Sequence, residues 1–398
     1  MVTLTRNTDR YKVLPGEGYD GVVQVFANGS YGTGTLLHGG RAVLTSAHLL
    51  DGANSVTVRI DTPAGRFSLQ ASQYALHPFY ERVDSNSDLA LVWLSDPAPI
   101  SAERSALFRD SNELGSAVTL MGYGLPGDGA TGYVEDGTPV PTKRFAENRF
   151  DTTGEALKAN FGRGITWDPL ADSQLIIDFD NGSAATDALG VLMGINDTGR
   201  GNSEGLIAPG DSGGPAFIAD KVAGIATYTA SLSRNGQSTD VNDIPDSSFG
   251  EIASFQRVSY YQQWIDQSLR LADPNAPTRS DDVITWALEG DAGTQRIYFL
   301  LEFNGSRDDA EQWLSVDYTT RDGTATAGED YLAVADTLIL YPGETQAAIT
   351  VEVIGDALPE PDETFYLDVF NPQGGSFGVG VAQLTAVRTI VDDDVWLG

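Results

Sequence analysis

Short apolar runs separated by turn-forming residues recur along almost the whole chain, and this pattern limits the fold more than any other feature. The runs at 22–26, 55–60 and 89–94 are rich in valine, leucine and isoleucine, and each lies close to glycine, asparagine or aspartate. Runs of this length between turn residues are typical of antiparallel barrels and sandwiches. The 44 glycines and 18 prolines agree with this, because tight turns need special backbone angles. The sequence therefore predicts an all-β protein.

Two segments depart from the strand pattern and divide the chain. Residues 254–271 contain neither glycine nor proline, and their apolar side chains fall on one helical face, which predicts a single amphipathic helix. The segment 272–277 breaks that pattern with two prolines, and short alternating strands then resume. At 398 residues the chain is too long for one ordinary core. We expect an N-terminal extension at 1–20, a first domain at 21–272 and a second domain at 278–396.

The net charge of −32 excludes one class of partner and is unevenly distributed. Residues 275–398 hold 23 acidic residues against five arginines and no lysine, a net charge of −18. Nucleic acid would be repelled by such a chain, so we do not expect it as a partner. No apolar run approaches the roughly 20 residues of a membrane helix, so no membrane span is expected.

The chain contains no cysteine, which excludes disulfides, thiolate zinc sites and a cysteine nucleophile. The first residues lack the apolar core of a Sec signal peptide. If the protein is exported, either a signal has been removed or another route is used.

The segment Pro209-Gly210-Asp211-Ser212-Gly213-Gly214-Pro215 carries the strongest chemical signal. A serine hydroxyl is a poor nucleophile unless a base takes its proton and donors receive the oxyanion. Glycines around Ser212 allow backbone N–H groups to turn toward one point, as an oxyanion hole requires. An ordinary glycine-rich turn is the alternative for this segment taken alone.

Only three histidines exist to act as the base, and His48 is the best placed. His38 precedes two glycines and His77 precedes a proline, so both resemble turn residues, whereas His48 ends an apolar run. Asp88 stands immediately before the apolar strand 89–94 and is therefore expected to be buried. A buried carboxylate is costly without a partner, and an imidazole N–H would supply one while fixing the useful tautomer.

Three motifs now resemble those of trypsin-like serine proteases, in the same order along the chain: Thr45-Ser46-Ala47-His48, Asp88-Leu89-Ala90-Leu91 and Gly210-Asp211-Ser212-Gly213-Gly214-Pro215. The resemblance extends from about residue 21 to residue 265 and implies a double β-barrel closed by a C-terminal helix. It also implies that Ser212 is the nucleophile, His48 the base and then the acid, and Asp88 the orienting group. The N–H groups of Gly210 and Ser212 would form the oxyanion hole. The substrates implied are proteins or peptides, and the chemistry needs no cofactor.

Several positions differ from the family pattern. Leu49 stands where a cysteine usually follows the catalytic histidine, and the usual Ile-Val-Gly-Gly start is absent near residues 16–20. In the family Asp211 would pair with a freed N-terminal amine, and cleavage near 16–20 and an internal cation are two alternatives for that role here. For the substrate pocket, the resemblance gives Leu206 as the floor, with Tyr228 and Thr229 in the wall. An apolar floor predicts cleavage after small or medium apolar residues, unless the loop turns Glu204 inward.

Acidic residues recur at the strand ends of the C-terminal part, and as a set they resemble a Calx-beta domain from about residue 280 to residue 394. The resemblance implies an immunoglobulin-like β-sandwich and calcium as its cofactor. Calcium takes roughly six to eight oxygen ligands, which loops meeting at one end of a sandwich would supply. A solvated acidic rim is the alternative, and Gly355 occupies a position where the family often has a further acid. The ligands implied are Glu289, Asp330, Asp356, Glu360, Glu363, Asp392, Asp393 and Asp394.

The sequence as a whole predicts a secreted serine endopeptidase with a calcium-binding Calx-beta module whose partner is unknown. Two alternatives stay open. One is a catalytically silent protease homologue that serves as a calcium-dependent adhesion protein. The other is an esterase that uses the same triad, which sequence does not separate from a peptidase.

Overall fold

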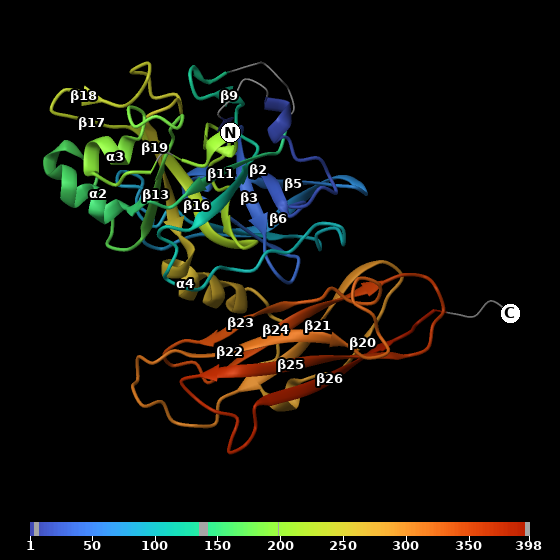
Figure 1. The fold of residues 1–398 in the computed structure, drawn as a ribbon. Coiled ribbons are helices and arrows are strands. Elements are labelled where there is room, and N and C mark those ends of the chain that lie inside the picture. The colour runs from blue at the N-terminus through green and yellow to red at the C-terminus, as the bar shows by residue number, and fades with distance from the viewer. Residues whose placement is uncertain (4–7, 135–141, 198, 395–398) are drawn as a thin grey trace. The chain divides into compact units, whose positions relative to one another are not determined.

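The computed structural model describes residues 1–3, 8–134, 142–197 and 199–394, and Figure 1 shows their arrangement within each part. The chain forms two compact units. The first consists of Met1–Leu37 and Arg41–Gln262, and the second of His38–Gly40 and Gln263–Gly398. The border along the chain lies within helix α4 (Val258–Leu271). Among the helices described, none has the length and apolar character needed to cross a membrane.

The first unit begins with a closed barrel whose strands follow the order β2-β3-β4-β7-β6-β5. The alternation of β5 shows how the sequence directs its formation, since Val56, Val58 and Ile60 are buried while the residues between them are only half-buried. Side chains from both ends of the barrel sequence fill one core. The strands are β2 (Val22–Ala27), β3 (Ser30–Leu36), β4 (Ala42–Thr45), β5 (Val56–Thr62), β6 (Gly65–Leu76) and β7 (Ala90–Leu94).

A seven-stranded antiparallel sheet, in the order β11-β8-β15-β16-β19-β13-β12, forms the other half of the first unit. Its core contains Leu120, Phe150, Ile177 and Phe255, all fully buried. The prediction of an all-β double-barrel fold is confirmed, with a half-barrel sheet as the second barrel. The strands are β8 (Ala117–Gly122), β11 (Arg144–Arg149), β12 (Thr152–Thr153), β13 (Gln174–Asp178), β15 (Pro215–Ile218), β16 (Lys221–Ser231) and β19 (Glu251–Arg257).

Smaller elements surround these two sheets. A four-stranded sheet has the order β10-β9-β1-β14, and it brings the first residues of the chain beside the segment that precedes Ser212. Its strands are β1 (Val2–Thr3), β9 (Gly127–Asp128), β10 (Gly132–Tyr133) and β14 (Gly205–Leu206). The remaining elements are the hairpin β17 (Ser233–Arg234) and β18 (Gln237–Ser238), helices α1 (Ala47–Leu50), α2 (Gly154–Phe161) and α3 (Ala188–Met193), and 3-10 turns η1 (Thr8–Tyr11), η2 (Gly162–Gly164) and η3 (Gly201–Ser203).

The helix predicted over 254–271 begins later than expected, because residues 254–257 finish strand β19. There they pair on one side with β13 and on the other with β16. The pairing to two neighbouring strands overrides a local pattern that also fits a helix. The apolar face remains, with Val258, Tyr261 and Ile265 buried.

The second unit is a β-sandwich, as predicted. A five-stranded sheet in the order β20-β26-β25-β22-β23 and a two-stranded sheet of β21 and β24 share one core. Phe299 and Val351 come to this core from the smaller sheet, and Val316 and Phe365 from the larger. The elements are η4 (Ser280–Asp282), β20 (Trp286–Leu288), β21 (Gly293–Glu302), β22 (Leu314–Asp322), β23 (Ala335–Leu340), β24 (Gln346–Gly355), β25 (Glu363–Gln373) and β26 (Gln383–Val391).

Candidate active site and metal centre

His48 lies in the single turn of α1, directly after strand β4, and both of its contacts with Asp88 are short. Its backbone N–H donates to Asp88 Oδ1 at 2.8 Å, and its ring Nδ1 lies 2.7 Å from Asp88 Oδ2. Asp88 is 1% exposed, so this carboxylate has left water and depends on His48 for compensation. A proton on Nδ1 that donates to Asp88 leaves Nε2 free to act as a base.

Ser212 is held in a turn that two glycines make feasible. Gly210 has φ +95° and Gly213 has φ +80°, and a Cβ on Gly213 would lie 2.1 Å from Thr45 Oγ1. The Ser212 carbonyl accepts the amide of Thr33 at 2.8 Å, which ties this turn to strand β3 of the barrel that also carries His48.

Three amides of this turn are already engaged in the fold. Those of Asp211, Gly213 and Gly214 donate to the carbonyls of Ala208, Ala226 and Asp211 at 2.9, 2.9 and 2.8 Å. The engaged amides therefore fix the turn without involving those of Gly210 and Ser212, the two predicted for the oxyanion hole.

Asp211 pairs with a group that the sequence did not single out, the α-amine of Met1. The amine nitrogen lies 2.7 Å from Asp211 Oδ2, and both groups are fully buried. The amine also donates to the carbonyl of Leu125 at 2.7 Å. Burial lowers the pKa of the Met1 amine, and the Asp211 carboxylate opposes this.

Two glycines make room for the Asp211 carboxylate. A Cβ on Gly122 would lie 2.0 Å from Asp211 Oδ1, and one on Gly124 would lie 2.4 Å from Asp211 Oδ2. The amide of Gly124 donates to Asp211 Oδ1 at 2.8 Å. Asp20, by contrast, pairs with Lys143 at 3.3 Å, with both side chains buried.

The predicted pocket residues lie on β14 and β16. Leu206 is fully buried in the core and pairs with Val2 of β1. The Tyr228 hydroxyl donates to Gln174 Oε1 at 3.0 Å, and its ring meets Trp167 edge-on at 5.7 Å. Thr229, the next residue, is half-buried. Trp167 was not singled out from the sequence, since it stands in no motif.

Both carboxylate oxygens of Glu204, close in sequence to Leu206, accept hydrogen bonds from backbone amides. Its Oε1 accepts the amide of Asp180 at 2.9 Å, and its Oε2 accepts the amide of Arg200. Burial, opposed by these amides and reinforced by neighbouring acids, raises the pKa of Glu204 to about 8. The carboxyl group therefore serves to hold two loop segments together.

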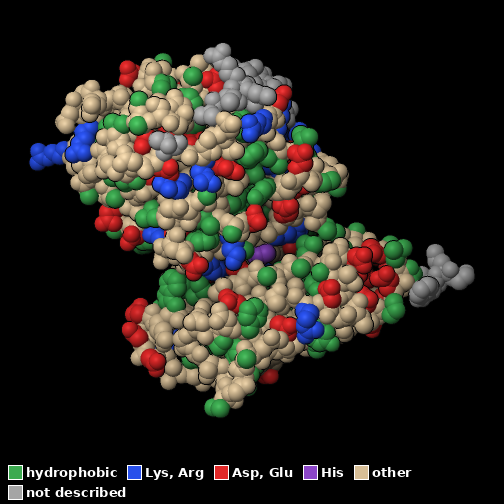
Figure 2. Space-filling view, viewed as in Figure 1, with side chains coloured by type: hydrophobic (Ala, Val, Ile, Leu, Met, Phe, Trp, Pro, Cys, Tyr) green, Lys and Arg blue, Asp and Glu red, His purple; other side chains and the backbone are tan. Residues whose placement is uncertain are grey.

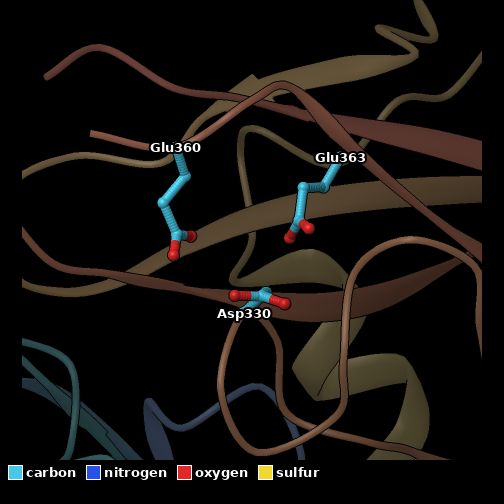
Figure 3. A group of neighbouring side chains, drawn as sticks. All are labelled: Asp330, Glu360 and Glu363. Carbon is cyan, nitrogen blue, oxygen red and sulfur yellow. The ribbon is translucent and has the colours of Figure 1, made fainter. Parts of the chain in front are cut away.

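In the second unit, the carboxylates of Asp330, Glu360 and Glu363 converge, with ligand atoms within 4.8 Å of one another (Figure 3). We call this group the candidate metal centre. Burial, together with Asp330 and Glu360, raises the pKa of Glu363 to about 7. Burial also raises the pKa of Glu289 to about 7, with Asp356, Glu360 and Asp392 adding to the shift. Acidic side chains are seen gathered at one end of this unit in Figure 2.

The other predicted ligands lie around the same loops. Asp392 Oδ1 is buried without a hydrogen-bond partner in the described part of the chain. Asp393 Oδ1 accepts the amide of Gly290 at 2.9 Å, and Asp356 Oδ1 accepts that of Leu358 at 2.6 Å. Burial and then Asp291 and Asp392 raise the pKa of Asp394. The side-chain donors in this region are all oxygens, and one of them, Asp392 Oδ1, is buried without a hydrogen-bond partner in the described part of the chain. Such a set fits calcium.

The missing acid at position 355 has a steric reason. A Cβ on Gly355 would lie 2.2 Å from the carbonyl oxygen of Gly290. No side chain fits there while strand β24 keeps its pairing with β21.

Comparison with known proteins gives two family matches. Residues 13–206 match the trypsin family and residues 302–394 match the Calx-beta domain family. Sodium/calcium exchanger 2 of Rattus norvegicus is 41% identical over 92 residues, which cover 20% of this chain and 10% of the exchanger. Sodium/calcium exchanger Calx of Drosophila melanogaster is 42% identical over 89 residues, covering 22% of this chain and 9% of the exchanger. The match thus spans only about a tenth of these relatives.

Solved structures are similar as well, and neuropsin is one example. Neuropsin, a serine protease expressed in the limbic system of mouse brain, has a TM-score of 0.47 and 18% identity, over 65% of this chain and 98% of its own.

Proposed function

Because the chain joins a trypsin family domain at residues 13–206 to a Calx-beta domain at residues 302–394, we propose that it is a secreted serine endopeptidase with a calcium-binding module. The observation that carries the proposal is the pair of short contacts between His48 and the buried Asp88 carboxylate. A surface histidine has no need of a buried carboxylate, whereas a general base needs one to fix its tautomer.

In this proposal Ser212 Oγ attacks the peptide carbonyl while His48 Nε2 takes its proton. His48 then gives that proton to the leaving amine, and the acyl-enzyme on Ser212 is hydrolysed by water activated in the same way. Asp88 stabilises the imidazolium that forms at each step and stays ionised throughout. The developing oxyanion is received by the amides of Gly210 and Ser212, in a turn that the neighbouring hydrogen bonds already hold rigid.

The pocket proposed from Leu206, Tyr228 and Thr229 favours small or medium apolar residues before the scissile bond. Both oxygens of Glu204 are already bonded to loop amides, which supports an uncharged pocket. A lysine or arginine side chain entering such a pocket would lose its hydration without gaining a counter-charge.

In the second unit, Asp330, Glu360 and Glu363 would hold a calcium ion, with Glu289, Asp356 and Asp392 to Asp394 around them. The ion would neutralise carboxylates that otherwise repel one another, and it would take no part in the hydrolysis.

The test is digestion of a mixed peptide library by the full chain, with the Ser212→Ala variant as control. We expect cleavage after small or medium apolar residues by the unaltered chain and none by the variant. Cleavage mainly after lysine or arginine would reject the proposed pocket. Hydrolysis of esters without peptides would identify an esterase, and no hydrolysis at all would favour the adhesion protein. Recovery of the protein from the medium of producing cells tests secretion.

A further inference from the structure

Residues 239–251 of the first unit, which we call the acidic loop, lead from β18 into β19 and carry four acids and no basic residue. Two hydrogen bonds close the loop, from the Val241 amide to the Phe249 carbonyl at 3.0 Å and from Thr239 Oγ1 to the Gly250 carbonyl at 2.8 Å. Within the described residues, no arginine, lysine or histidine forms an ion pair with any acid of this loop. Among the described residues, no basic side chain therefore offsets the buried charge of this loop.

Three oxygen atoms of the acidic loop are buried and have no hydrogen-bond partner among the residues described: Asp240 Oδ2, Ser247 Oγ and Glu251 Oε2. Asp240 is 7% exposed, Ser247 1% and Glu251 0%. Buried polar atoms are nearly always paired, so three unpaired oxygens in one short loop call for a ligand. The Ser247 hydroxyl is not an acid, so it indicates a ligand independently of the acidic composition.

Hydrogen bonds tie the residues that carry these three oxygens to one turn. Glu251 Oε1 accepts the amides of Asp246 at 2.8 Å and Ser248 at 3.0 Å, the two residues on either side of Ser247. Ser248 Oγ in turn donates to Asp240 Oδ1 at 3.2 Å. In both Asp240 and Glu251, one carboxylate oxygen thus accepts hydrogen bonds from the turn, and the other has no hydrogen-bond partner among the described residues. Burial, with Asp240 and Asp246 adding to it, raises the pKa of Glu251 to about 7.

We propose that the acidic loop binds a calcium ion through Asp240, Ser247 and Glu251, at a site separate from the candidate metal centre of the second unit. All three ligand atoms are oxygens and two are carboxylates, the donors that a hard divalent cation prefers. Water molecules complete the coordination shell. Magnesium fits less well, because it demands near-ideal octahedral geometry from its ligands.

The position of this ion gives it a structural consequence within the protease unit. The Phe249 amide donates to the Gly129 carbonyl at 2.7 Å, and the Gly129 amide donates to the Thr3 carbonyl at 2.9 Å. Thr3 belongs to β1, and the residue directly before this strand is Met1, whose amine pairs with Asp211. A calcium ion in the acidic loop therefore stabilises the hydrogen bonds that link this loop, through Gly129, to the N-terminal strand.

The test is calcium titration by calorimetry of the full chain in which Asp330→Asn, Glu360→Gln and Glu363→Gln have removed the candidate metal centre. We expect this chain to bind calcium at one site, and magnesium more weakly. Adding Asp240→Asn and Glu251→Gln should abolish the binding heat. The matched control is Asp243→Asn, which removes one charge from an exposed residue of the same loop and should leave the binding heat unchanged.

Stability gives a second, independent measurement. In chelator, Asp240→Asn should raise the melting temperature of the first unit, because it relieves repulsion, while cancelling the rise that calcium produces. Hydrogen exchange of residues 239–251 should slow on adding calcium to the chain that lacks the candidate metal centre. Absence of a binding heat in that chain, unchanged exchange, or equal binding after Asp240→Asn and Glu251→Gln would overturn the proposal. If the double variant does not fold, the single Asp240→Asn variant and the exchange experiment decide.

Discussion

At the scale of single residues, the first unit depends on two buried carboxylates that do different work. Asp88 uses both oxygens on one histidine, through its backbone and its ring. Asp211 instead binds the Met1 amine and the amides of Gly124 and Ala208, beside the proposed nucleophile. In the proposed mechanism the first carboxylate orients the base, while the second holds the turn that carries Ser212.

Asp88→Asn should reduce kcat by about 10⁴-fold, because an amide N–H facing His48 would favour the tautomer that has no free base at Nε2. KM should change little, since the pocket is untouched. Steady-state kinetics on a peptide found in the library test will measure this. The control is Asp96→Asn, the same change at an exposed residue. A loss below about tenfold, roughly 1.4 kcal/mol, would mean that Asp88 does not orient the base.

At the scale of elements, the proposed sites lie where strands end. His48 follows β4, Asp88 precedes β7, and Ser212 precedes β15. The candidate metal centre follows the same rule, since Glu363 begins β25 and Asp392 comes directly after β26. Strand pairing fixes the ends of neighbouring strands against one another, so loops of unrelated sequence are brought to one place.

The second unit should lose stability in chelator as the pH rises from about 4.5 to about 7. Burial and neighbouring acids raise the pKa of Glu289 and Glu363 to about 7, above that of the unfolded chain. The folded state therefore binds more protons in this range, and stability falls as those protons leave. Thermal melts of the unaltered chain and of the Glu289→Gln, Glu363→Gln variant should diverge as the pH rises. Parallel curves would contradict this, and calcium should remove the fall.

The extent to which sequence predicts structure differs between these elements. The barrel strands and the sandwich were predictable, because their alternation of apolar residues is local. The start of α4 was not, because residues 254–257 fit a helix locally and only their two neighbouring strands make them β. The Met1 contact was missed because no local pattern links residue 1 to residue 211. The convergence of Asp330 with Glu360 and Glu363 followed from family resemblance, and spacing alone does not give it.

At the scale of the whole molecule, the negative charge is distributed unevenly along the chain. Residues 275–398 carry −18 of the total charge of −32, although they make up less than a third of the chain. Such self-repulsion destabilises a compact state unless cations offset it. Calcium is therefore expected to act mainly on stability, through the Calx-beta domain, and the proposed acidic-loop site would add to this in the first unit.

The candidate metal centre is proposed to take no part in hydrolysis, and sites that do not interact change each other's free energies by no more than about 0.5 kcal/mol. The combined variant Asp330→Asn, Glu360→Gln, Glu363→Gln should therefore keep kcat/KM within about twofold of the unaltered chain. The same variant should lose the calcium-dependent rise in the melting temperature of the second unit. Kinetics and melting are to be measured on one preparation with and without calcium. A large loss of kcat/KM would show that the candidate metal centre takes part in catalysis.

Labelling of the full chain with a fluorophosphonate, which reacts with activated serine hydroxyls, tests the proposed triad most directly. We expect one labelled site, located at Ser212 by peptide mass analysis, and no label in the Ser212→Ala variant. His48→Ala should slow labelling by orders of magnitude while Ser212 remains in place. Labelling that persists in Ser212→Ala, or an unaltered chain that does not react at all, would contradict the assignment of a working triad.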